Sequence, residues 1–165
     1  MVRALSNVFT TGALKAAIAA AILSASAATA AAAVNPFALL IGKWSGNGIM
    51  TMNDGTRDRI VCDAEHSGNA MQLRLIIHCV SGERDIRMKA TLSSNAGRLL
   101  GFWEEKYFNA AGAITGIATE NKISFTVSGN VNGKMIVSYS KTRQKISIVT
   151  KDVPLSSLQI DMKRR

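Results

Sequence analysis

The sequence predicts an all-β protein, an antiparallel up-and-down β-barrel of about eight to ten strands. Polar and apolar residues alternate with a period of two in runs short enough to be single strands, at 71–75, 86–92, 122–127, 145–149 and 158–162. Turn-forming residues separate these runs at regular intervals, at 53–55, 67–69, 81–83, 95–97, 109–112, 129–130 and 132–133. Each run is therefore expected to form a strand with one buried face and one face in water.

Closure of the sheet follows from the number of strands. Helical periodicity is confined to a short stretch at 36–41, "PFALLI", so no helix is expected to cover a sheet edge. A long meander must then close on itself or leave exposed edges that promote aggregation. We therefore expect a closed barrel, with a two-sheet β-sandwich as the alternative.

Residues 1–30 have the features of a secretory signal peptide. Arg3 and Lys15 carry positive charge, an uncharged alanine-rich run follows at 16–34, and small-residue sites occur at 25–27 and 28–30. Cleavage is expected between about residues 27 and 34. It would leave a single β-barrel domain at 36–165, no transmembrane span, and a periplasmic or secreted location. An uncleaved membrane anchor is the alternative, because the run approaches the ~20 residues of a membrane span.

The charge balance is basic. The whole chain has a net charge of +9, and loss of Arg3 and Lys15 with the leader leaves 18 basic against 11 acidic residues, or +7. Such a charge favours contact with an anionic component of the cell envelope, although solubility alone also explains it. Export argues against nucleic acid as a partner.

Cys62 and Cys79 are the only cysteines, and an even number in an exported protein is typical of a disulfide. A tight hairpin at 66–69 would place Cys62 opposite residue 73, so the bond requires a shifted connection or a strongly coiled sheet. Two thiolates as metal ligands are the alternative. Only His66 and His78 lie nearby, and both are expected to face solvent, so no metal site is predicted.

The stretch "IGKWSGNG" at 41–48 predicts the first strand. Gly42, Trp44, Gly46 and Gly48 share one face of it, where glycine permits a bend or a close approach of another backbone. We expect this face to point inward, with the Trp44 ring plugging one end of the barrel. A Gly-x-Trp element in the first strand resembles the calycin superfamily of lipocalin-like barrels.

Most of the mature chain resembles a family of small secreted β-rich proteins of alphaproteobacteria with no established function. The resemblance rests on the leader and on "IGKWSGNG", "DGTRDRIVCDAE", "LRLIIHC", "GFWEE" and "QKISIVTKDVPLSSLQI". It implies that Cys62 and Cys79 pair, and it implies no catalytic residue.

Two other barrel families share features with this chain. Secreted inhibitors of bacterial metalloproteases are similar in size, export, one disulfide and an early tryptophan, but their inhibitory arm is the mature N-terminus, where this chain has only small residues. Nitrobindin-like haem barrels also begin with a Gly-x-Trp strand. They need an axial histidine on a late strand, and this chain has no histidine after His78. No cofactor is therefore expected.

The segment "LLGFWEEKYF" supplies the main polar candidate. If Trp103 faces inward, so does Glu105, whereas Glu104 points the other way and cannot form a catalytic carboxylate pair with it. A buried carboxylate needs a partner, for which Arg98 or a lysine is expected, and it could orient a ligand. Trp44, Trp103 and Glu105 are thus candidate ligand-lining or barrel-plug residues.

On the opposite face of the same segment, Leu100 and Phe102 are expected to point outward. An exposed apolar patch would indicate a partner or a membrane surface. We expect a neighbouring loop or the 36–41 segment to cover it.

These patterns predict a non-enzymatic envelope protein, because no combination of acid, base and nucleophile is visible. It would bind a small apolar ligand inside the barrel or an anionic envelope component on its surface. A protein-binding module such as a secreted protease inhibitor is the alternative. A cavity of ~300 Å³ or more would favour a ligand. A barrel filled by Met50, Leu75, Met88, Phe125 and Met135 would instead act through its surface.

Overall fold

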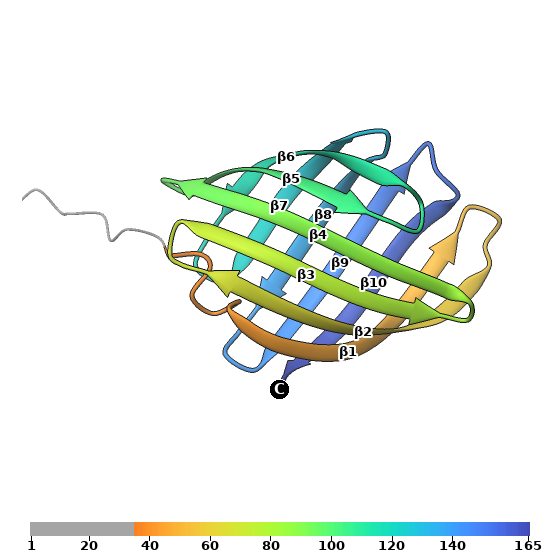
Figure 1. Cartoon of the computed structure of the whole chain (residues 1–165), viewed down its shortest axis with the longest axis horizontal. Helices are drawn as coiled ribbons and strands as arrows, with labels where there is room; N and C mark the ends of the chain where they lie inside the picture. The colour runs from red at the N-terminus through yellow and green to blue at the C-terminus, as the bar shows by residue number, and fades with distance from the viewer. Residues whose placement is uncertain (1–34) are drawn as a thin grey trace, which may run out of the picture. The chain divides into compact units, whose positions relative to one another are not determined.

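The computed structural model describes residues 35–165, which form an antiparallel β-barrel (Figure 1). The predicted signal peptide at 1–30 lies outside the described residues. The ten strands are β1 (Gly42–Met52), β2 (Arg57–Gly68), β3 (Gln72–Ser81), β4 (Arg84–Asn95), β5 (Arg98–Glu105), β6 (Ala110–Ala118), β7 (Lys122–Gly129), β8 (Asn132–Tyr139), β9 (Arg143–Lys151) and β10 (Leu155–Arg164).

Closure comes from β1, which pairs with β2 on one side and with β10 on the other. Every other strand pairs with its neighbours in the sequence, so the sheet has no free edge. The predicted up-and-down barrel is confirmed, with the number of strands at the upper end of the expected range. The alternative of a two-sheet sandwich is wrong.

Buried and exposed side chains alternate along the strands of the barrel, as the period of two in the sequence predicts. In β3, every second residue from Leu73 to Ser81 is buried inside, and the residues between them face solvent. Side chains alternate across a strand, so one apolar residue in two is enough to fill the interior. The core therefore lies inside the barrel.

The two ends of the barrel are built differently. At one end, called the mouth here, lie the turns that follow β1, β3, β5, β7 and β9, on the right in Figure 1. At the other end, called the base, lie the remaining turns, the segment 36–41 and the last residues of β10.

Candidate ligand cavity

A cavity of about 240 Å³ lies inside the barrel. Apolar side chains make nearly all of its wall, and they come from the inward faces of the strands. The residues that the sequence predicted as barrel filling all border it: Met50, Leu75, Met88, Phe125 and Met135. They surround the cavity rather than occupy it. Its volume is somewhat below the ~300 Å³ at the lower end of drug-sized sites, but exceeds the ~150 Å³ that suffices for benzene.

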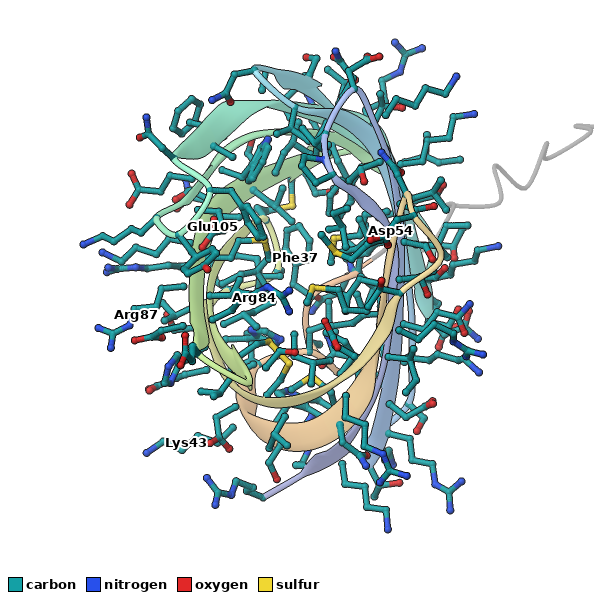
Figure 2. All side chains as sticks on the ribbon, turned by 90° about the vertical axis from the view of Figure 1, so that its right-hand side faces the viewer. Phe37, Lys43, Asp54, Arg84, Arg87 and Glu105 are labelled. Carbon is teal, nitrogen blue, oxygen red and sulfur yellow. A yellow bond between two sulfur atoms is a disulfide. The ribbon has the colours of Figure 1, made fainter. Side chains whose placement is uncertain are left out.

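The cavity lies toward the mouth. Its lining includes residues of three mouth turns, namely Phe108, Val131 and Pro154. Figure 2 looks into this end, and Phe37 is visible through the lumen at the far side. A ligand would therefore enter between the mouth turns.

The base is closed by the N-terminal segment. Phe37 and Leu40 are buried and belong to the core. The Trp44 indole is fully buried beneath them and donates from Nε1 to the Leu40 carbonyl at 2.7 Å. Tyr139 donates its hydroxyl to the Pro36 carbonyl at 2.6 Å, and burial raises the pKa of Tyr139 to about 12. The structure thus places Trp44 in the base, where it does not line the cavity.

Arg164 fastens this segment to the barrel. Its guanidinium donates to the backbone carbonyls of Leu39, Ile41 and Lys141 and lies 4.3 Å from the centre of the Trp44 ring. A planar guanidinium suits this combination of several hydrogen bonds with a ring contact, which a lysine ammonium cannot reproduce. The last strand therefore secures the segment that precedes the first.

Trp103 and Glu105 line the cavity. The Glu105 carboxylate accepts hydrogen bonds from the backbone N–H groups of Arg87, Tyr107 and Phe108, at 3.0, 2.8 and 2.7 Å. The expectation that Arg98 or a lysine would neutralise it is wrong, because backbone donors of β4 and of the β5–β6 turn take that place. Glu105 fixes this turn at the mouth.

The other polar groups of the lining are also occupied. Asn130 accepts from Ala111 N–H at 2.8 Å and donates to the Asn109 carbonyl at 2.7 Å, and Thr150 donates to the Leu155 carbonyl. The Trp103 indole N–H has no partner within 35–165, but neighbouring atoms cover it completely. The cavity therefore offers a ligand an apolar wall.

Cys62 and Cys79 form a disulfide inside the barrel, with their Cα atoms 4.1 Å apart. The predicted position of the turn, 66–69, is wrong. The β2–β3 turn is centred between Ala70 and Met71, three residues later, so Gly68 pairs with Leu73 and Cys62 faces Cys79 directly. This later turn is the shifted connection that the bond was expected to require. A disulfide of this kind is typical of an oxidising compartment.

His66 does not face solvent as predicted. It is 2% exposed, because β2 continues past it and its inward register includes Cys62 and Ala64. Its Nε2 lies 3.4 Å from Gln144 Nε2, and burial lowers the pKa of His66 to about 4. His78 is on the outer face, as expected, and pairs with Asp85 at 2.7 Å.

Acid is expected to destabilise the barrel through His66. Its imidazole stays neutral in the folded protein down to about pH 4, whereas the unfolded chain takes up this proton below pH 6.5. The contribution of His66 to the free energy of unfolding is therefore fully present above pH 6.5. It is lost as the pH falls toward 4, by about 3 kcal/mol in all. Urea unfolding at a series of pH values should show this loss in the wild type. The same series on His66→Gln should lack that component, and an identical loss in both proteins would contradict the assignment.

The outer face of β5 and β6 carries exposed apolar side chains. Leu100 is 62%, Phe102 55% and Ile117 62% exposed. The expectation that the 36–41 segment or a loop would cover Leu100 and Phe102 is wrong, since Phe37 and Leu40 fold into the base instead. Within 35–165 this patch has no cover.

No group of three or more histidine, cysteine, aspartate or glutamate side chains in 35–165 is arranged to hold a metal ion. No helix in this part of the chain has the length and apolar character needed to cross a bilayer.

The fold resembles solved structures of very different sequence. No protein-family model and no curated protein sequence matches the chain. Rv2717c from M. tuberculosis is 10% identical with a TM-score of 0.60, and the match covers 82% of this chain and 98% of that one. The S-type phycobiliprotein lyase CPES from Guillardia theta is 9% identical with a TM-score of 0.52, over 78% and 89% of the two chains. At these identities the similarity shows the fold alone, a closed antiparallel β-barrel.

Proposed function

We propose that the protein is an exported, non-enzymatic carrier that binds one small apolar ligand in the barrel. The observation that carries this proposal is the apolar cavity of about 240 Å³ inside a barrel whose base is closed by its own N-terminal segment. Cavities of this kind do not fill with ordered water, because water finds no polar partners there. An apolar molecule can occupy such a space with little competition from solvent.

The lining supports binding rather than catalysis. Among the residues of 35–165 that border the cavity, Glu105 is the sole side chain able to ionise, and three backbone N–H groups hold its carboxylate. One similar structure is that of a phycobiliprotein lyase, but at 9% identity the likeness extends to the fold and not to an activity.

Export is part of the same proposal. The leader at 1–30 and the buried disulfide both favour an oxidising location, either the periplasm or the exterior of the cell. The excess of basic residues would favour an anionic envelope surface as a docking place. A protease inhibitor remains the alternative function, with the exposed patch on β5 and β6 as its point of contact.

Binding of 1-octanol to the mature protein tests the proposal. Burial of the octyl chain should contribute about 6 kcal/mol at ~0.8 kcal/mol per methylene, which corresponds to a Kd on the order of tens of micromolar by titration calorimetry. Ala90→Phe should reduce this affinity at least tenfold, because Ala90 borders the cavity and a phenyl ring would occupy it. Native mass spectrometry of protein from its own envelope would then identify the natural ligand by its added mass.

The matched control is Ala113→Phe, the same change on the outward face of β6, where the side chain is exposed. This variant should bind octanol like the wild type. Absence of octanol binding to the wild type, or equal loss in both variants, would overturn the proposal.

A further inference from the structure

The occupied polar groups of the cavity restrict what a ligand can place there. This inference rests on the proposed binding function. Glu105, Asn130 and Thr150 direct their polar atoms to the backbone, and the Trp103 N–H is covered. A polar group deep in the cavity would lose its hydrogen bonds with water and find no replacement, which is costly. Any polar group of the ligand must therefore lie at the mouth.

Arg84 lies at the mouth, as the first residue of β4. It is on the inward register of β4, next to Ile86 and Met88, which both border the cavity. Figure 2 shows its side chain directed into the lumen rather than away from the barrel. Its Nη1 lies 2.7 Å from Asp58 Oδ2, and both side chains are 32% exposed. The pair joins β2 and β4 across the end of β3, at the mouth of the barrel, beside the residues that line the cavity rather than among them.

The guanidinium of Arg84 has N–H donors that make no side-chain hydrogen bond. Arginine has five N–H donors in a planar fork, and the contact with Asp58 is the one side-chain hydrogen bond that Arg84 makes within the described chain. Ser81 pairs with Arg84 in the β3–β4 ladder and is also on the inward register, but neighbouring atoms cover its hydroxyl as they cover the Trp103 N–H. The partly exposed guanidinium is therefore the group at the mouth that can meet a polar head.

We propose that the ligand is a small amphiphile with an anionic carboxylate head, and that Arg84 binds this head while the apolar tail fills the cavity. A carboxylate can engage the guanidinium through two parallel hydrogen bonds, which is the geometry that an arginine fork favours. Asp58 holds Arg84 in place in the empty protein and competes with the ligand for it. The net charge of the mature chain, +7, attracts the same anions.

Octanoate and 1-octanol provide the test, because they share a tail and differ in the head group. At neutral pH, Arg84→Gln should weaken octanoate binding about tenfold and leave octanol binding unchanged. Arg84→Lys, which keeps the charge and loses the fork, should give an intermediate loss. Asp58→Asn should strengthen octanoate binding at least threefold, since it removes the competing carboxylate.

Arg87→Gln is the matched control. Arg87 lies on the same strand, faces outward, and pairs with Asp85 at 2.7 Å. It should change neither affinity. Octanol binding also reports whether each variant has kept its cavity. If octanol binds and octanoate shows no dependence on Arg84, the carboxylate inference is overturned and the apolar carrier stands. If octanol itself fails to bind to the wild type, the proposed function fails with it.

Discussion

Replacing Trp44 with alanine is expected to lower the free energy of unfolding by about 3–5 kcal/mol, the range for deletion of a large buried aromatic side chain. Trp44 is fully buried, and its ring contacts the guanidinium of Arg164 at 4.3 Å from the ring centre. The change would also leave the Leu40 carbonyl without its 2.7 Å donor. Urea unfolding followed by circular dichroism measures the loss directly.

Trp44→Phe separates the contribution of the buried ring from that of the Nε1 hydrogen bond. Phenylalanine retains most of the ring and the contact with Arg164 but cannot donate to Leu40, so the expected loss is about 1–3 kcal/mol, that of an unpaired buried carbonyl. Hydrogen exchange at the Leu40 and Ile41 amides, which both bond to the Phe37 carbonyl, should accelerate more in Trp44→Ala than in Trp44→Phe. A loss below 1 kcal/mol in Trp44→Ala would mean that the 36–41 segment is not needed to close the base.

Adding a single methyl group at Gly48 is expected to destabilise the barrel by about 3 kcal/mol or to prevent folding. Its Cβ would overlap the Gln159 carbonyl oxygen and lie 2.9 Å from Ile160 Cα, both in the backbone of β10. Backbone that is already paired cannot withdraw as a flexible side chain would, so the overpacking cost is at the upper end of its usual range. The position matters because β1 and β10 make the closing contact of the barrel.

Asn47→Ala is the control for Gly48→Ala. Asn47 is the preceding residue on β1 and is exposed on the outer face, so its substitution should change stability by less than about 0.5 kcal/mol. Thermal unfolding of the two variants side by side gives the comparison. Equal stability of Gly48→Ala and the wild type would show that β1 and β10 approach each other less closely than described here.

The sequence was sufficient to predict the class of fold. Alternation with a period of two is a local property of each strand, and the turn residues between runs mark where the chain reverses. The inward faces of Trp44, Trp103 and Glu105 follow from the same parity rule. His66 is an even number of residues from Cys62, so the alternation also predicts that it faces inward. The residues after His66 resemble a turn, however, and β2 was therefore expected to end before it.

Contacts between distant parts of the chain were not predictable. Arg164 reaches Leu39 and Ile41 only because the first and last strands pair. Arg84 meets Asp58 only because three strands have one particular register. A shift of one residue in any ladder would turn these side chains to the other face of the sheet. The local pattern does not specify the register across strands with this accuracy.

The sequence by itself determined a closed antiparallel barrel with an apolar interior and the pairing of its two cysteines, and the export leader at 1–30 stays a prediction. Only the tertiary structure decided that the interior is incompletely filled, that the cavity lies toward the mouth, and that Arg84 is at the same end of the barrel. The physical reason is that a cavity is a small difference between the space enclosed by ten strands and the volume of the side chains within it. Residue types set the second quantity, whereas strand number, register and coiling, which arise from the whole sheet, set the first.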